Sequence, residues 1–133
     1  AVGGALGSVA SAPVVARGHE LRLSGELGPR ETYTLAQMQM MQEEARVPMW
    51  QFLQNNFPVF LESIPAQWRR RTPRLAASFC DAERLDQLDA LFETYGSRAA
   101  GHERALNETR EMVQLCAAFK AETEADLVAE FLE

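Results

Sequence analysis

Apolar residues recur at intervals of three and four along most of this chain, which is the spacing of one face of an α-helix. The clearest run is Leu85, Leu88, Leu91, Phe92 and Tyr95. No segment alternates apolar and polar residues with the period of two that a half-buried strand requires. The pattern predicts helices over residues 14–23, 33–41, 48–57, 75–80, 85–95 and 101–132, and it leaves open a break in the last helix near Thr123.

Prolines mark where most of these helices are expected to begin, because a proline in the first turn loses no helical hydrogen bond. Five of the six prolines have this position: Pro13, Pro29, Pro48, Pro65 and Pro73. Thr72 and Asp81 are predicted to cap the helices that follow them. Gly96, directly after Tyr95, is predicted to end a helix.

Short helices joined by tight turns pack as antiparallel pairs, and a row of such pairs forms a curved layer. We therefore predict an all-α fold over residues 1–133, an irregular array of antiparallel helix pairs that forms a segment of a HEAT-like α-solenoid. The prolines are spaced too irregularly to assign a named repeat. The opening AVGGALGSVASAP resembles the end of a helix that begins further upstream, so the first helices of such a fragment should expose an apolar face and favour self-association.

Composition excludes two classes of function. The chain of 133 residues (14.8 kDa) has no apolar run near the ~20 residues of a membrane span. Its net charge is −6, and basic residues cluster only in residues 69–74, whereas duplex binding needs many phosphate contacts along a basic face. The composition therefore argues against a membrane-spanning role and against nucleic-acid binding.

Residues that carry catalytic or metal chemistry are scarce. The sequence has no HExxH, no GxSxG and no phosphate-binding glycine loop, and His19 and His102 lie in different segments without ligand-like neighbours. We therefore predict no catalytic, metal-binding or cofactor-binding residue. Cys80 and Cys116 form no CxxC motif; the interpretation we favour is two buried thiols that act as small hydrophobes, and a disulfide remains open if their helices are neighbours.

The arginines of the segment WRRRTPR are the candidate binding residues: Arg69, Arg70, Arg71 and Arg74. Their guanidinium groups could bind a carboxylate through two parallel hydrogen bonds. Alternatively, they pair with acids of the following helix, such as Asp86 or Asp89.

The order of these segments resembles a known enzyme family. WQFLQNNF, an IP turn with arginines, LDQLDALF and ALNETREMVQLCAAF are similar to the end of the C-terminal helical domain of zinc aminopeptidases of the puromycin-sensitive and endoplasmic-reticulum type. The matching segments are residues 50–57, 85–92 and 106–119, and Leu91 departs from the second aromatic residue found in many members. Trp50 is expected to anchor the core.

The resemblance implies a non-catalytic domain that covers the active site and shapes peptide access and length selection, with possible contact of Arg69, Arg70, Arg71 and Arg74 to the peptide carboxylate. Zinc is expected in a separate catalytic domain of the parent chain, and the partners are the remaining domains and the peptide substrate. The alternative is a stand-alone helical-repeat scaffold for protein interactions. Usage rich in alanine, arginine and glutamine suggests a bacterial source, hence the cytoplasm or the periplasm.

Overall fold

A computed structural model describes residues 28–132 of the chain. In order, the elements are α3 (Pro29–Met41), α4 (Glu43–Ser63), the 3₁₀ helix η1 (Ala66–Ala76), α5 (Glu83–Tyr95), the short 3₁₀ helix η2 (Gly96–Arg98) and α6 (Glu103–Leu132). No strand occurs among these residues, which confirms the predicted all-α class. The predictions for the helix over residues 14–23, for Pro13 and for His19 lie outside the described residues.

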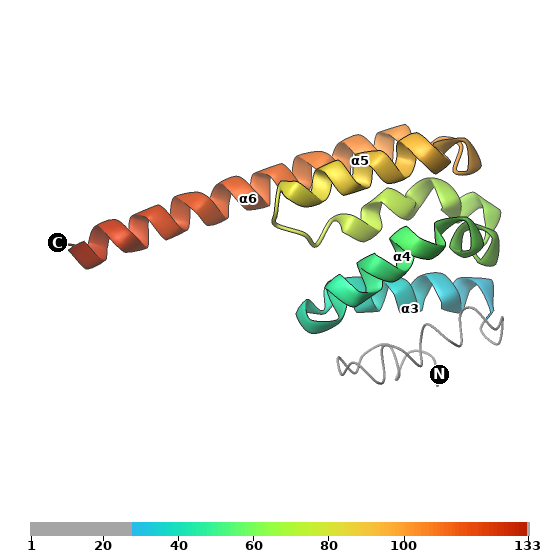
Figure 1. Ribbon diagram of the computed structural model, residues 1–133, viewed down its shortest axis with the longest axis horizontal. Helices are drawn as coiled ribbons and strands as arrows, with labels where there is room; N and C mark the ends of the chain where they lie inside the picture. The colour runs from blue at the N-terminus through green and yellow to red at the C-terminus, as the bar shows by residue number, and fades with distance from the viewer. Residues whose placement is uncertain (1–27, 133) are drawn as a thin grey trace.

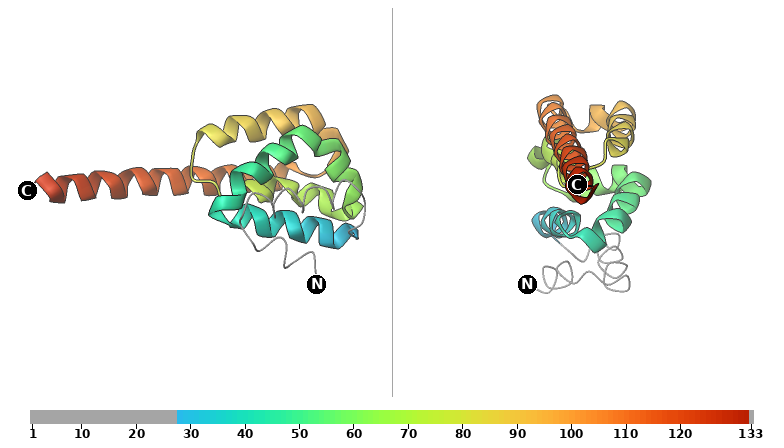
Figure 2. Two further views of the ribbon diagram at one scale, coloured as in Figure 1. Left: turned by 60° about the horizontal axis from the view of Figure 1, so that its bottom comes forward. Right: turned by 90° about the vertical axis from the view of Figure 1, so that its left-hand side faces the viewer.

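Successive long elements run back along one another, so α3 and α4 form an antiparallel pair and α5 and α6 run in opposite directions (Figure 1). Viewed along α6, α3 and α6 lie on one side of the molecule and α4 and α5 on the other (Figure 2). The 3₁₀ helix η1 contacts α3, α4 and α6. This arrangement places η1 and the start of α6 side by side. A longer superhelix of such pairs stays a prediction.

Trp50 is the centre of the apolar core, as the sequence predicts. Its side chain is 2% exposed, and its ring meets Phe79 edge to face with 5.6 Å between ring centroids. The indole Nε1 donates a hydrogen bond of 2.8 Å to Oε1 of Gln87 on α5. Because the polar edge of the ring has a partner, the large apolar surface is buried without an unpaired donor.

The start of α4 differs from the prediction. The helix begins at Glu43, and Pro48 lies inside it. Arg46 fixes the earlier start, since its Nε donates a 2.7 Å hydrogen bond to the carbonyl of Met40 at the end of α3. The helix is interrupted at Asn56 (φ −133°, ψ 24°) because Pro58, two residues later, lacks an N–H and its ring crowds the preceding turn.

The predicted helix over residues 75–80 is also wrong, because the 3₁₀ helix η1 ends at Ala76 and a turn and irregular backbone follow it. Thr72 does not cap a helix: its hydroxyl donates a 2.7 Å hydrogen bond back to the carbonyl of Arg69. Asp81 does not cap α5 either, since Ala82 occupies the cap position and no side-chain hydrogen bond is made there. Pro73 explains the loss of the α-helical ladder, because it cannot donate to a carbonyl of the preceding turn. The end of α5 at Tyr95, before Gly96, is confirmed.

Cys80 and Cys116 form a disulfide, so the interpretation as two buried thiols is wrong. Their Cα atoms are 5.0 Å apart, and Cys116 is exposed on α6. The bond joins the turn before α5 to the middle of α6 across 36 residues, a loop whose closure stabilises the fold by about 3 to 4 kcal/mol. Local sequence patterns do not predict that these two segments meet, since their proximity depends on how α6 packs.

Beyond Cys116, α6 continues without a break through Thr123 to Leu132 and projects away from the other helices (Figure 1). Its side chains from Ala118 onward are exposed. The molecule therefore has two regions, a packed body that ends near Cys116 and a projecting half of α6.

Candidate functional site: an arginine basin

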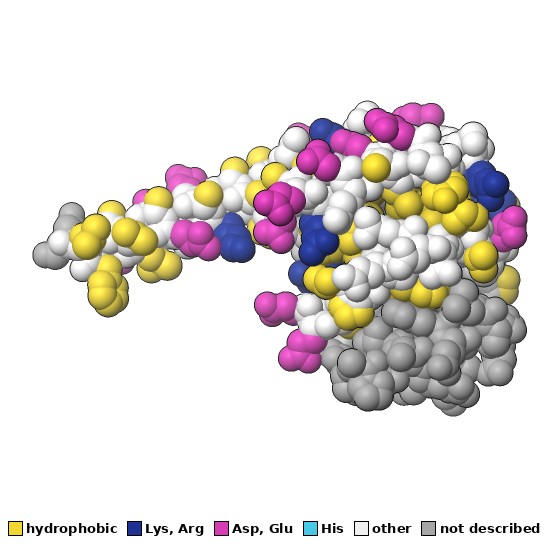
Figure 3. All heavy atoms as spheres, in the orientation of Figure 1, with side chains coloured by type: hydrophobic (Ala, Val, Ile, Leu, Met, Phe, Trp, Pro, Cys, Tyr) yellow, Lys and Arg dark blue, Asp and Glu magenta, His cyan; other side chains and the backbone are white. Residues whose placement is uncertain are grey.

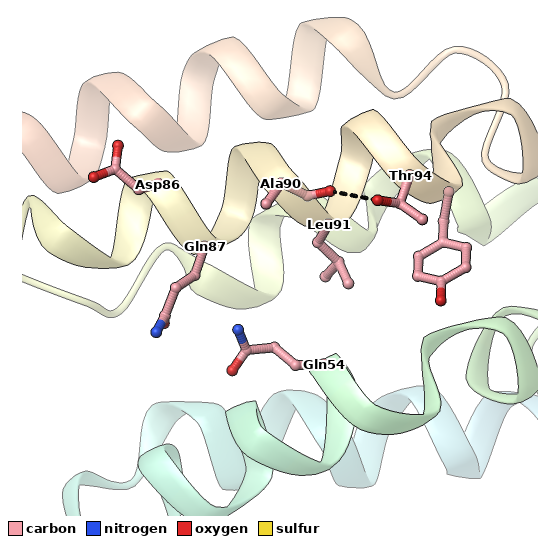
Figure 4. Close-up of a pocket in the computed structure, with 7 residues that line it drawn as sticks. Gln54, Asp86, Gln87, Ala90, Leu91 and Thr94 are labelled. Carbon is pink, nitrogen blue, oxygen red and sulfur yellow. Dashed lines mark hydrogen bonds between the residues drawn. The ribbon is translucent and has the colours of Figure 1, made fainter.

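A groove lies between α4 and α5 and is one of two hollows that are candidates for a binding site. It measures about 430 Å³, and Gln54 and Gln87 point toward one another across it, while the Thr94 hydroxyl donates to the Ala90 carbonyl of its own helix (Figure 4). Oε1 of Gln87 already accepts hydrogen bonds from Trp50 and Arg84. Gln87 Oε1 and the Thr94 hydroxyl are therefore already hydrogen-bonded within the protein.

The second hollow, which we call the arginine basin, lies between η1 and the start of α6. Its charged lining residues are Arg70, Arg71 and Arg74 from η1 and Arg104 from α6, and Gly101 and Ala105 complete it. The basin is open to solvent and has a volume of about 540 Å³. Gly101 has a φ of +87°, a conformation that other residues rarely adopt, and this turn brings the start of α6 beside Arg70.

The 3₁₀ geometry of η1 separates Arg69 from Arg71 and Arg74. In this helix residues three apart lie on one edge. Arg71 and Arg74 therefore share an edge with Trp68, whereas Arg69 shares another edge with Thr72 and Leu75, which are buried.

Arg69 is consequently turned away from the basin. Its Nε donates a 2.6 Å hydrogen bond to the carbonyl of Leu61 near the end of α4, and it lines a separate hollow with Glu62 and Arg98. Of the four predicted arginines, the structure brings together Arg70, Arg71 and Arg74 and separates Arg69, whose role is to hold η1 against α4.

Glu108 is the acid that pairs with this basin. Its carboxylate accepts a 3.0 Å hydrogen bond from Nε of Arg104 and one of 3.1 Å from Nη2 of Arg74. The hydrogen bond from Arg104 and the charge and hydrogen bond of Arg74 lower the pKa of Glu108 below its usual value. Arg74 and Arg104 pair with this one carboxylate, and Arg70 and Arg71 line the same hollow, so the basin carries a net positive charge.

The predicted partners Asp86 and Asp89 are wrong. Asp89 pairs with Arg110 of α6, and neither acid is among the ion-pair partners of the basin within residues 28–132. The reason is topological, because η1 packs mainly against α6, with smaller contacts to α3 and α4.

A smaller hollow of about 250 Å³ continues from the basin toward α3. Arg71 and Arg74 line both hollows, and here they face Trp68 and Tyr33, with Thr34 and Gln37 beside them. The rings of Tyr33 and Trp68 meet edge to face at 5.4 Å. Burial raises the pKa of Tyr33, and the positive charges of Arg71 and Arg74 oppose that rise. Guanidinium groups and aromatic rings therefore form one continuous surface.

Arg104 is the basin residue that sequence analysis missed. It precedes Glu108 by four residues, a spacing that predicts an ion pair on one helix face. That signal identifies the pair but not its position, since only the packing of α6 on η1 brings it to the other arginines.

His102 has a packing role. Its ring is half-buried and stacks on Phe92 with 5.0 Å between centroids, and its Nδ1 lies 3.2 Å from the Ala99 carbonyl. A Cβ at Gly96 would lie 2.6 Å from Cε1 of this ring, so the close approach requires glycine there.

Within residues 28–132, His, Cys, Asp and Glu side chains do not gather into a group that could hold a metal ion. None of the described helices is both long and apolar enough to cross a membrane. Comparison of the chain with family models, with curated proteins and with solved structures finds no significant match.

Proposed function

We propose that this chain is a non-catalytic helical domain that binds the carboxylate end of a peptide, as the C-terminal domain of a zinc aminopeptidase would. The observation that carries the proposal is the basin in which Arg70, Arg71, Arg74 and Arg104 face one cavity beside a single paired acid. Arginine forks bind carboxylates through two parallel hydrogen bonds, and each charged hydrogen bond contributes about 1.5 to 3 kcal/mol when water is displaced.

The form of the surface supports a peptide over a simple anion. The hollow that adjoins the basin presents Trp68 and Tyr33 to the residues that precede the terminal carboxylate, and Gln37 and Thr34 offer hydrogen bonds to a peptide backbone. In the complete enzyme, zinc would activate water in another domain. The chain described here would hold the far end of the peptide and thereby set which lengths reach the zinc.

Binding to the chain itself is the direct test. Trp68 lines the aromatic hollow, and Trp50 is buried, so a change in tryptophan fluorescence reports a ligand beside Trp68. A peptide with a free C-terminal carboxylate should bind about tenfold or more tightly than the same peptide with a C-terminal amide. Arg71→Ala combined with Arg74→Ala should remove that difference.

Two further variants test whether the affinity for the free-acid peptide changes in the expected direction. Glu108→Gln removes the competing carboxylate and should strengthen binding of the free-acid peptide by a few fold. Arg98→Ala removes an exposed arginine that lines a different hollow and should leave binding unchanged. Equal affinity for the acid and amide peptides in the wild-type chain would overturn the peptide proposal.

The role in an aminopeptidase has its own test. If an HExxH motif lies upstream in the same reading frame, the complete enzyme should lose part of its preference for peptide length when Arg70 and Arg74 are changed to Ala. Unchanged kinetics on both long and short peptides would contradict a role in length selection.

A stand-alone scaffold for protein interactions is the second candidate. It is favoured by the projecting half of α6, where Phe131 is 94% exposed and Leu132 is 83% exposed. A start codon directly upstream of Ala1, with no peptidase domain before it, would favour the scaffold over the aminopeptidase domain.

The disulfide bears on the compartment. Disulfides persist in oxidising compartments, so of the cytoplasm and the periplasm we propose the periplasm. Trapping of free thiols in intact cells should then leave Cys80 and Cys116 unlabelled, and labelling of both would exclude this compartment.

A further inference from the structure

One face of α6 carries three different zones in succession. Arg104 begins it, beside the rest of the arginine basin. Three apolar residues follow, which we call the α6 stripe: Met112, Leu115 and Phe119. The acidic end comes last: Glu122, Asp126 and Glu130. Glu108 lies between Arg104 and the stripe. With Glu108 included, successive residues of this series lie three or four positions apart, so all of them share one side of the helix.

The α6 stripe is uncovered by its own body. Met112, Leu115 and Phe119 are 54%, 65% and 71% exposed. The face of α6 that packs inward carries Ala105, Thr109 and Val113, and it is rotated from the stripe by roughly 100° around the helix. Three neighbouring large apolar side chains at this exposure on a helix are typical of an interaction surface.

The charges at the C-terminal end of α6 are placed against the helix dipole. The acidic end lies where a positive charge is favoured, whereas in the first turn Arg104 follows the favourably placed acid Glu103. No Lys or Arg follows Lys120 in the sequence. Within a single copy, Arg104 and Glu130 are roughly 39 Å apart along the helix and cannot neutralise each other.

A second copy that runs antiparallel can place an opposite charge beside Arg104 and beside Glu130. If Leu115 lies opposite Phe119 of the second copy, Arg104 lies opposite Glu130 of that copy, since each is eleven residues from the stripe residue named. The two-fold axis then repeats both contacts, which makes the surface self-complementary. In this arrangement Leu115 and Phe119 pack at the centre and Arg104 pairs with Glu130 at each end, while Met112 lies opposite Glu122. Asp126 lies opposite Glu108, whose carboxylate is already paired with Arg74 and Arg104.

We propose that two copies of this chain form an antiparallel dimer through the exposed face of α6, with the α6 stripes packed together and the acidic end of each copy against the arginine basin of the other. The inference does not depend on peptide binding, because it requires only the α6 stripe and the charges that flank it. Figure 3 shows that hydrophobic and acidic side chains lie along the projecting half of α6.

Sedimentation of the full chain without peptide tests the dimer. From low micromolar to several hundred micromolar protein, the average mass should rise from 14.8 kDa toward twice that value. Leu115→Glu combined with Phe119→Glu should keep the chain monomeric across the range, because two charges would enter the apolar centre. Val59→Glu alters an apolar residue of α4 that is 50% exposed, and it should leave the association unchanged.

Charge reversal tests the direction of the helices. Arg104→Glu should weaken association by about tenfold, and Glu130→Arg by a similar factor. The two changes together should restore most of the loss, because each new charge meets its opposite on the other copy. Circular dichroism of each variant shows that the fold is kept.

Several results would overturn the proposal. A wild-type chain that stays monomeric at several hundred micromolar would overturn it. That result would mean, for example, that another segment of the same chain covers the stripe. Association that survives the changes at Leu115 and Phe119 would also do so, since a different surface would then be responsible. Failure of the reversed charge pair to restore association in a folded variant would contradict the antiparallel arrangement.

Discussion

The two halves of α6 belong to one helix but hold their conformation for different reasons. From Glu103 to Cys116, one side of the helix packs against the body through Ala105, Thr109 and Val113, and a disulfide fixes its end. From Ala118 to Leu132, every side chain is exposed. The comparison shows that tertiary packing accounts for the first half, whereas the second depends on its own propensity or on a partner.

Sequence composition agrees with this division. The projecting half is rich in Ala and Glu, which favour helices without tertiary contacts. A helix of this length is marginal in water by itself, but here it extends a helix that is already nucleated in the body. Its exposed Leu127, Val128 and Phe131 add nothing to the stability of a single copy.

The largest expected effect contrasts an aromatic residue of each region. Trp50→Ala should lower the free energy of unfolding by about 3 to 5 kcal/mol, because it opens a large cavity in the core and removes a hydrogen bond to Gln87. Phe131→Ala, at a side chain 94% exposed, should leave that free energy unchanged. Urea unfolding of dilute protein measures both. Equal losses would mean that the projecting half is packed like the body.

The next effect concerns the boundary between the regions. Changing both Cys80 and Cys116 to Ser should lower the free energy of unfolding by about 3 to 4 kcal/mol, since the open loop gains freedom in the unfolded chain. Hydrogen exchange should also speed up in residues 110–116, because the bond no longer holds the middle of α6. Addition of a reductant to the wild-type chain should give the same stability as the variant, and a smaller loss in both would show that packing alone sets the boundary.

Local signals in the sequence predicted the α-helices of the body better than the 3₁₀ segment of residues 66–76. The Leu and Phe pattern of residues 85–92 and the glycine at position 96 gave α5 almost to the residue, because periodicity and a helix stop act within a few residues. Pro29 likewise marks the start of α3. The segment of residues 66–76 was harder, since a short arginine-rich run with a proline does not distinguish a period of 3.6 from one of 3.0.

The candidate site was predictable only in part for the same reason. The arginines of residues 69–74 were visible as a cluster, but in the structure Arg69 turns to the Leu61 carbonyl while Arg70, Arg71 and Arg74 line one hollow. Arg104 and the disulfide both depend on the packing of α6 against η1 and the turn before α5. Contacts between residues more than thirty apart in the chain leave no mark in local periodicity.

The smallest expected effect is the removal of residues 120–133. Because these side chains make no buried contact within the described part of the chain, the shortened protein should keep its free energy of unfolding within about 0.5 kcal/mol of the complete chain. The measurement requires concentrations at which both are monomeric, since dimerisation through α6 would stabilise only the complete chain. The helical signal in circular dichroism should fall in proportion to the residues removed if the projecting half is helical in a single copy. A marked loss of stability would show that the projecting half packs on its own chain, and the division of α6 into a packed and an unpartnered half would then be wrong.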